Sequence, residues 1–581
     1  MKFTSTLFSL FSKKQEYLFL FIIFFSILSN LLQIFGLTSI IPLITILASE
    51  EKILEIDFFN KIYIYFNIES IKDFKYFLFY VSIFGISIST FFSLCSMYLN
   101  SYFSNKFSES LERKIFKYYI QEEYVYFSKN NISQIISKIT NEIPRIKQNI
   151  VSNSIGLIIN TSMLIFLTIS ILFVDLFVSI IAILSLGIFY GLFFFNVKRI
   201  ATRQGENISN LQYKKTKSIL DSLNNIKYLK FINDEKFYIN IHRFSSNKLA
   251  KIFINNSIII NFPRVVMEFT LFLGTVLICL YFSNTYGSFS EFLPMLTIFA
   301  IASIKALPAI NQIFTAIISL KSNISALYSF EEEYLNMKKS EIVSSDEELI
   351  FKENIKLENV SFKYPSGNFK IDNLNLEIKK NNFVGFCGTT GSGKTTLIDI
   401  LSGLISPNQG NLSIDSIPLK KNQLTNYRKI IGYVPQEIFL GNLTIKESIA
   451  LGYNTDNINQ KTVEESCKLA DIHEFIVTLK DGYETMVGDN GIKLSGGQKQ
   501  RIGIARALYK KPKILIFDEA TSSLDYHTEN KIIETVTSFK GKITLIMITH
   551  RLETIKNCDT IFEVSDGKLL KQKRFEDLKL N

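Results

Sequence analysis

The chain contains no tryptophan, four histidines and five cysteines in 581 residues. The cysteines are far apart and none forms a CxxC pair, so neither a thiol-ligated metal site nor a CxxC redox centre is predicted. We expect reduced residues of helices or cores at these positions, which are Cys95, Cys279, Cys387, Cys467 and Cys558. Three of the histidines, His242, His473 and His527, lie outside any motif and are interpreted as ordinary polar side chains.

Hydrophobic residues make up 47% of the chain, and the mean hydropathy is +0.20. They are concentrated before about residue 325 in blocks long enough to cross a bilayer, which needs roughly 20 residues. The six blocks cover residues 17–48, 75–103, 152–174, 176–197, 253–283 and 292–320. The rest has the composition of a soluble α/β protein. We therefore predict a six-helix transmembrane domain at 1–330, a charged linker at 331–350 and an α/β domain at 351–581.

The net charge of +11 lies mainly in segments between the apolar blocks, so membrane topology explains it better than nucleic-acid binding. Residues 104–148 contain eight Lys or Arg and residues 198–251 contain twelve, whereas 282–291 contains none. The positive-inside rule places both long segments and both termini in the cytoplasm. Isoleucines of "ISQIISKITNEIPRI" recur at steps of three and four, which predicts an amphipathic helix that extends a span into the cytoplasm.

The connection 49–74 is external on this topology. Its stretch "IDFFNKIYIYFNI" places Phe58, Phe59, Ile62, Tyr63 and Phe66 on one helical face. This pattern favours a helix lying at the membrane surface over a helix that guides a substrate.

The first motif with chemistry is "NFVGFCGTTGSGKTTLIDIL", an apolar strand, a glycine-rich turn and a helical apolar pattern. Its GxxxxGK[ST] spacing predicts a loop that wraps phosphates with its backbone, with Lys394 reaching the β- and γ-phosphates and the Thr395 hydroxyl on Mg²⁺. The predicted contacts to the nucleotide are Gly388, Thr389, Thr390, Gly391, Ser392, Gly393, Lys394, Thr395 and Thr396.

The second motif, "KILIFDEA", has the pattern of a buried strand that ends in two carboxylates. Asp518 would hold Mg²⁺ or its water, and Glu519 would polarise the attacking water as the catalytic base. A third stretch, "LSGGQKQR" from Leu494 to Arg501, would open a helix whose first turn presents free N–H groups to an anion.

"LSGGQ" between a phosphate loop and "ILIFDEA" resembles the signature of ATP-binding cassette proteins, and the resemblance covers about 220 residues. It implies that Tyr364 of "SFKYP" stacks on adenine and that Gln436 of "YVPQE" touches Mg²⁺ and links the nucleotide to the membrane helices. It also implies a D-loop role for Asp525 of "SSLD" and a γ-phosphate contact from His550 of "ITH". The catalytic set implied is therefore Glu519, His550 and Gln436, with ATP and Mg²⁺ as cofactors.

The resemblance further implies two cassettes that face head to tail, so that each nucleotide lies between two subunits. The second subunit would cap the γ-phosphate with its signature residues, which are Ser495, Gly496, Gly497 and Gln498. One chain carries one cassette, so we expect a domain-swapped homodimer. The cytoplasmic turns "YFSKNNISQIISKIT" and "DSLNNIKYLKFINDE" are expected to dock on the cassettes near Gln436 and carry the coupling.

Six spans before one cassette resemble an exporter-type half-transporter, and "ETMVGDNGIKLSGGQ" resembles that branch, with Asp489 where a glutamate is usual. Span five holds Arg264 and Glu268, four residues apart, and span six holds Lys305. Charges inside an apolar span usually face a pathway or a partner. The alternative is that Arg264 and Glu268 only neutralise each other and that Lys305 snorkels to the surface.

These residues, with the external helix, also resemble bacterial flippases of lipid-linked oligosaccharides and polysaccharide precursors. That resemblance implies translocation of such a glycolipid across the bacterial cytoplasmic membrane, with Arg264 and Lys305 as contacts for its pyrophosphate. Two alternatives stay open: an exporter of lipid A-type lipids or of drugs, and a regulatory or channel-like cassette protein. The expected partners are a second copy of the chain, the lipid bilayer and the substrate, with the cassette in the cytoplasm and no nucleic acid.

Overall fold

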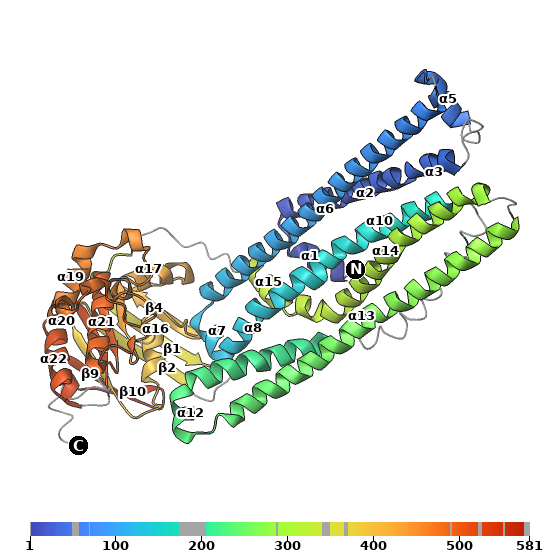
Figure 1. Cartoon of the computed structure of the whole chain (residues 1–581). Helices are drawn as coiled ribbons and strands as arrows, with labels where there is room; N and C mark the ends of the chain where they lie inside the picture. Colours follow the sequence, from blue (N-terminus) through green and yellow to red (C-terminus); the bar gives the residue numbers. More distant parts are fainter. Residues whose placement is uncertain are drawn as a thin grey trace. The chain divides into compact units, whose positions relative to one another are not determined.

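The computed structural model describes residues 2–48, 57–68, 70–172, 180, 205–285, 289–339, 349–364, 370–488, 491–520, 526–549 and 552–573 (Figure 1). The chain divides into two compact units. The first consists of Met1–Glu122 with Asn130–Ser340, and the second of Glu123–Lys129 with Glu341–Asn581.

The first unit is helical. Its labelled α-helices are α1 (Lys2–Ser9), α2 (Lys13–Thr38), α3 (Ile40–Ala48), α5 (Asp57–Tyr65), α6 (Ile71–Gln121), α8 (Ile132–Ser137), α9 (Ile143–Ile146), α10 (Ser152–Leu172), α12 (Ile226–Ile232), α13 (Lys236–Thr285), α14 (Phe289–Tyr328) and α15 (Glu331–Lys339). Residues 205–224 are also helical. The helix predicted in the connection 49–74 is present as α5, and its Phe59, Ile62 and Tyr63 pack against buried residues of α3 and α6.

Five helical stretches of the described residues are long and apolar enough to cross a membrane. They are Lys13–Leu47, Ile71–Gln121, Ile132–Leu172, Lys236–Gly274 and Ala300–Tyr328. The predicted span at 176–197 lies outside the described residues, apart from residue 180.

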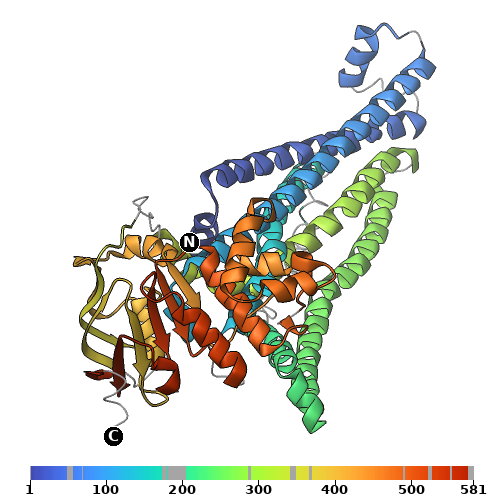
Figure 2. The same ribbon diagram turned by 90° about the vertical axis from the view of Figure 1, so that its left-hand side faces the viewer.

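Helices α2 and α6 lie side by side along most of α2, as both Figure 1 and Figure 2 show. Small residues at the contact allow the close approach, since hydroxyls and glycines occupy little space between apolar helices. The hydroxyls of Ser26 and Ser96 hydrogen-bond at 2.7 Å. A Cβ atom added at Gly36 would lie 2.8 Å from the Ser89 hydroxyl and 2.9 Å from a backbone oxygen of α6, so a larger residue does not fit there.

The amphipathic helix predicted from the isoleucine period is present, but it is not regular. Two π-helical turns, Lys138–Glu142 and Lys147–Val151, interrupt it on either side of α9. Each π turn shifts the face that points inward. Ile143 and Ile146 are therefore buried as expected, whereas Ile132 is exposed.

Between these two π turns lies Arg145, which is 7% exposed and forms an ion pair at 3.2 Å with the equally buried Glu142. The remaining guanidinium donors reach two other helices, the one that begins at residue 205 and α14. Their acceptors are the Ser209 hydroxyl, the Asn323 side-chain oxygen and the backbone oxygens of Gly205 and Ser322. One buried cation thus joins three helices, and we call this group the Arg145 hub.

The described residues of the second unit form two sheets. The strands are β1 (Asn354–Lys363), β2 (Lys370–Lys379), β3 (Phe383–Cys387), β4 (Gln409–Ile414), β5 (Ile417–Pro418), β6 (Ile431–Val434), β7 (Ile514–Asp518), β8 (Thr544–Ile548), β9 (Thr560–Ser565) and β10 (Lys568–Lys573). One sheet has the order β2-β1-β4-β5 and is antiparallel, with β1 covering most of the stretch "IKLENVSFKY" and β2 containing "NLNLEI". The other has the order β10-β9-β3-β8-β7-β6 and is parallel from β9 to β6.

The α-helices of this unit are α7 (Tyr124–Lys129), α16 (Lys394–Leu401), α17 (Leu424–Lys429), α18 (Ile445–Ile449), α19 (Gln460–Leu469), α20 (His473–Thr478), α21 (Gly496–Tyr509) and α22 (Tyr526–Thr537). Strands β3, β7 and β8 are buried along their whole length, as expected for parallel strands covered on both faces. Their carboxyl ends lie at one edge of the sheet, where β3 leads into the glycine-rich loop and β7 ends at Asp518.

Candidate functional site

The glycine-rich loop connects β3 to α16 by a path that only glycine allows at its first turn. Gly388 has φ of 150°, and a Cβ atom there would lie 2.1 Å from the backbone oxygen of Val564. Helix α16 then begins at Lys394 without any side-chain hydrogen bond at its N-cap, Gly393. Its first N–H groups are thus left for an external acceptor, and the helix dipole favours an anion at this end.

Two side chains of the loop fit a bound phosphate. The Lys394 ammonium donates to the backbone oxygens of Gly388 and Thr389 at 2.9 and 2.8 Å, which holds a cation inside the curve of the loop. Burial lowers the pKa of Lys394, while Glu519 and Asp518 oppose that shift. The hydroxyl of Ser392 is buried and has no hydrogen-bond partner among the described residues, so a phosphate oxygen would satisfy it.

Strand β7 ends at Asp518, and Glu519 follows it, as predicted. The Tyr433 hydroxyl of β6 donates to a carboxylate oxygen of Asp518 at 2.9 Å, and the Gln436 amide donates to Glu519 at 3.2 Å. Burial raises the pKa of Asp518, and the neighbouring Glu519 adds to the increase. Glu519 has φ of 48°, a conformation that is costly for a residue with a side chain and that is concentrated at functional sites.

The structure adds an acid that sequence reasoning missed, Asp399 of α16. It is buried, and burial followed by the charge of Asp518 raises its pKa from 3.8 to about 7. The negative charge of Asp518 thus acts on a second buried carboxyl group, that of Asp399. The local signal was a single carboxylate inside the apolar run "TLIDIL", but only the packing of α16 on the sheet reveals its neighbour.

Tyr364, the predicted adenine contact, follows β1 and packs edge-on against Phe362 at 4.9 Å between ring centroids. Its hydroxyl hydrogen-bonds Thr396 of the helix after the phosphate loop, and burial raises its pKa. Helix α7, which belongs to this unit although it lies between α6 and α8 in the chain, places Tyr124 close enough to add to that increase.

The signature stretch opens α21 as predicted. Ser495 caps the helix by accepting from the Gln498 N–H at 3.3 Å, and the Gln498 side chain accepts from the Ser495 N–H at 2.8 Å. This reciprocal pair fixes the start of the helix, and Gly496 and Gly497 place no side chains on its first two positions. Asp525, His550 and Asp489 lie outside the described residues.

The two cations predicted to contact a substrate lie in the first unit. Arg264 of α13 is 55% exposed and pairs with Glu268 at 2.9 Å on the same helix. Lys305 lies partly buried on α14. In the single chain, this ion pair is consistent with both interpretations of Arg264, as half of a neutralising pair and as a residue of a transport pathway.

The chain resembles known proteins along nearly its whole length. Residues 371–522 match the ABC transporter family, and residues 17–307 match the ABC transporter transmembrane region. A solved structure, a bacterial Atm1-family ABC exporter with ATP bound, superposes with a TM-score of 0.73 at 21% identity over 97% of this chain and 96% of that one.

Two curated relatives are similar in sequence. The uncharacterized ABC transporter ATP-binding protein YwjA of Bacillus subtilis is 35% identical over 59% of each chain. The heterocyst differentiation ATP-binding protein HepA of Nostoc sp. is 29% identical over 82% of this chain and 79% of its own. The chain spans only 59%, 17% and 18% of the lengths of the first three relatives that it matches.

Proposed function

The chain belongs to the ABC transporter family and has the Atm1-family exporter fold, and on that premise we propose that it is an ATP-driven exporter half-transporter acting as a homodimer. The observation that supports this most is the convergence of Lys394, Asp518 and Glu519 at the carboxyl edge of one parallel sheet. The proposed phosphate-binding cation, metal-binding carboxylate and catalytic base thus lie around one phosphate-binding loop.

In the proposed reaction, Lys394 and the N-terminus of α16 hold the β- and γ-phosphates of ATP. Thr395, Gln436 and Asp518 would hold Mg²⁺, which neutralises charge on the phosphates. Glu519 polarises the attacking water, and Gln436 and Tyr433 orient the two carboxylates by the hydrogen bonds described above. The partner's signature helix, α21, closes the site and excludes bulk water from the γ-phosphate.

ATP hydrolysis by the purified full-length chain tests the assignment. Glu519→Gln should retain ATP binding while kcat falls at least about 100-fold, since it loses the general base. Lys394→Ala should weaken binding of ATP itself. Glu465→Gln, an exposed carboxylate of α19, is the matched control and should hydrolyse ATP at the wild-type rate. Normal turnover in Glu519→Gln would remove Glu519 from the mechanism.

We further propose that the cytoplasmic turns carry the coupling between cassette and spans. Helix α7 already packs on the cassette core through Val125, and Glu123 forms an ion pair with Lys421. A separate cavity of about 300 Å³ in the same unit is lined in part by Tyr433, Leu451 and Tyr453. We propose that it receives residues 221–235 of the second copy.

The apolar surface of α12 supports this pairing, because Phe231 is 80% exposed and Tyr228 and Ile232 are exposed beside it. Cysteines placed at Phe231 and Leu451, in a chain freed of its five native cysteines, should cross-link only between two copies. A band at the mass of the dimer is the expected result. A pair placed at Tyr228 and Lys531, which lies on α22, is the control that should not cross-link.

For the substrate we propose a lipid-linked oligosaccharide or polysaccharide precursor of a bacterial cytoplasmic membrane, with Arg264 and Lys305 as contacts for its pyrophosphate. Two cations within apolar helices support an anionic headgroup. Neutralising either one should abolish flipping in proteoliposomes while basal ATPase survives. If Arg264 only balances Glu268, transport returns in the double variant. Export of lipid A-type lipids or of drugs is the competing outcome, recognised by stimulation of ATPase by those compounds instead.

A further inference from the structure

Three residues at steps of three on α21 hold the backbone of the loop that follows β6. They are Gln500, Gly503 and Arg506, and residues three apart lie next to each other on a helix. The loop runs from Gln436 to Phe439 and contains the candidate Mg²⁺ contact. Each of the three residues holds a different part of it.

Gln500 makes the first contact. Its side-chain amide donates to the backbone oxygen of Gln436 at 3.0 Å, and the residue is only 4% exposed. The oxygen of the same Gln500 amide is buried without a hydrogen-bond partner among the described residues. A buried amide that is only half satisfied is costly, so stability alone does not explain a glutamine here.

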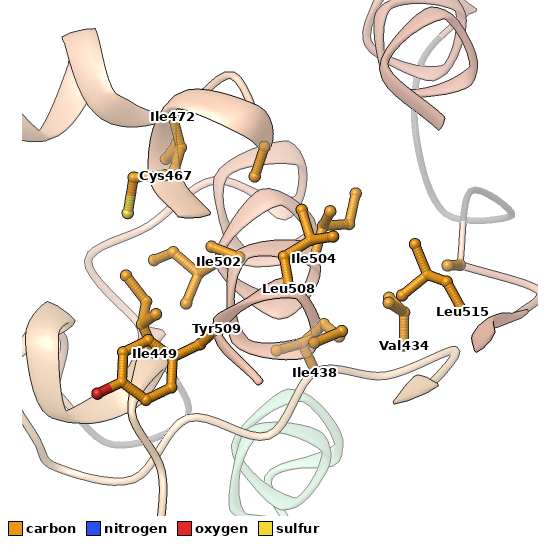
Figure 3. Packing of buried hydrophobic residues seen from close by; sticks show 14 of the residues in the cluster. Val434, Ile438, Ile449, Cys467, Ile472, Ile502, Ile504, Leu508, Tyr509 and Leu515 are labelled. Carbon is orange, nitrogen blue, oxygen red and sulfur yellow. The ribbon is translucent and has the colours of Figure 1, made fainter. Parts of the chain in front are cut away.

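Gly503 makes the second contact. A Cβ atom at this position would lie 2.3 Å from the terminal methyl carbon of Ile438, so the loop rests directly on the helix backbone. Glycine within a helix costs about 1 kcal/mol relative to alanine. The close approach of Ile438 explains why glycine nevertheless occupies this position. Figure 3 shows Ile438 beside the helix that carries Ile502, Ile504 and Leu508.

Arg506 makes the third contact. It donates to the backbone oxygen of Phe439 at 3.1 Å and to that of Ser448 at 2.7 Å. With backbone atoms held at 436 and 439 and a side chain seated at 438, the loop must follow a displacement of α21. The loop and the helix therefore move together.

In the proposed homodimer, helix α21 and the loop 436–439 would contact different nucleotides. In that dimer the N-terminus of α21 would contact the γ-phosphate bound to the partner subunit, whereas the Gln436 side chain donates to Glu519, the proposed base of the chain's own site. A shift of α21 on binding the partner's nucleotide is thus passed to Gln436 and on to Glu519. The connection from helix to base runs through the Gln500 amide.

We propose that Gln500 is a positioning residue that couples the two nucleotide sites of the dimer, so that ATP in one site orients Glu519 of the other. This inference rests on the proposed homodimeric ATPase. It predicts positive cooperativity in ATP hydrolysis, with a Hill coefficient above 1 and at most 2 for two sites.

The test uses the full-length chain in lipid nanodiscs, with ATPase rate measured against ATP concentration. Gln500→Met keeps the length and helix preference of the side chain but removes the donor to Gln436. We expect a Hill coefficient near 1 and a kcat about tenfold lower, a loss equal to about 1.4 kcal/mol of transition-state stabilisation. The matched control, Gln460→Met on α19, should keep the wild-type Hill coefficient and kcat.

A second pair of variants tests the same contact by packing. Gly503→Ala pushes Ile438 away from α21 and should also lower the Hill coefficient. Adding Ile438→Val removes the methyl carbon at 2.3 Å but keeps the γ-carbon at 2.9 Å, so it should restore the Hill coefficient in part. This pair decides the question if Gln500→Met fails to fold.

The outcomes separate the inference from the proposed function. A wild-type chain that hydrolyses ATP without cooperativity overturns the coupling but leaves the ATPase intact. A wild-type chain that does not hydrolyse ATP overturns the proposed function itself. If Gln500→Met lowers only the thermal stability and keeps the Hill coefficient, its role is structural and the inference is wrong.

Discussion

Replacing Arg145 by methionine should destabilise the first unit more than any exposed arginine replacement in it. Methionine is unbranched and shorter than arginine and carries no charge, so Glu142, which is 3% exposed, is left as a lone buried carboxylate. Breaking a buried ion pair from one side typically costs about 3–5 kcal/mol. The acceptors on the other two helices lose their donors as well, so the upper end of this range applies.

The double variant Glu142→Gln/Arg145→Met separates charge from packing. Without the lone carboxylate, only the acceptors on the two neighbouring helices are left without their donor, at about 1 kcal/mol each. Four such acceptors cost about 4 kcal/mol, against about 5 for the single change, so the double variant should be more stable than Arg145→Met alone by about 1 kcal/mol. Arg243→Met, an exposed arginine of α13, is the control and should unfold like the wild type.

Calorimetry of the full-length protein is the suitable assay, because the chain has no tryptophan to report unfolding by fluorescence. We expect the unfolding temperature of Arg145→Met to fall by about 5 °C or more, and that of the double variant to recover part of the loss. An Arg145→Met protein that unfolds within about 1 °C of the Arg243→Met control would refute the hub. A double variant no more stable than Arg145→Met would show that the unpaired Glu142 carboxylate does not account for the loss.

Three further changes have expected outcomes. The pKa of Asp399 is raised in the folded state, so its contribution to stability is present below about pH 4 and is lost as pH rises through about 7. Asp399→Asn should therefore stabilise the nucleotide-free protein at pH 8 by up to about 4 kcal/mol. Its calorimetric midpoint at pH 4 should equal that of the wild type. Gly205→Ala places a Cβ atom 2.4 Å from the backbone oxygen of Ser322, which cannot move aside, and calorimetry should show a loss of about 1–3 kcal/mol. Tyr427→Phe removes a hydroxyl that donates to a backbone oxygen of α16 at 2.7 Å, and urea unfolding should show a loss of about 1–3 kcal/mol in the free energy of unfolding. Wild-type stability in any of these three variants would contradict the contact on which its prediction rests.

The phosphate site could be predicted from sequence because its chemistry is local. A glycine-rich turn between a strand and a helix places Lys394 at the phosphates whatever the rest of the chain does, and a buried strand delivers Asp518 to the same edge. The neighbours of these residues could not be predicted in the same way. Tyr433 reaches Asp518 from another strand, 85 positions earlier in the chain, and no local spacing indicates that contact.

The cytoplasmic helix shows a second limit. The isoleucine period predicts one helix over 132–146, but it cannot reveal the π turns at Lys138–Glu142 and Lys147–Val151, because these add one residue to a turn without changing composition. The extra residues turn Arg145 and Glu142 inward. A charged pair that the period assigns to a solvated face is thereby buried at the junction of three helices.

Both limits have one physical origin, and it bears on the substrate. Sequence marks a charge as unusual by its immediate surroundings, but its role depends on the groups that distant elements bring to it. Arg145 becomes a structural cation because two other helices supply oxygen acceptors. Arg264, by contrast, is paired with Glu268 on its own helix and remains more than half exposed in the single chain. A cation that its own subunit leaves open can still contact the second copy or the transported headgroup, and this difference makes Arg264, and not Arg145, the residue to neutralise in a transport assay.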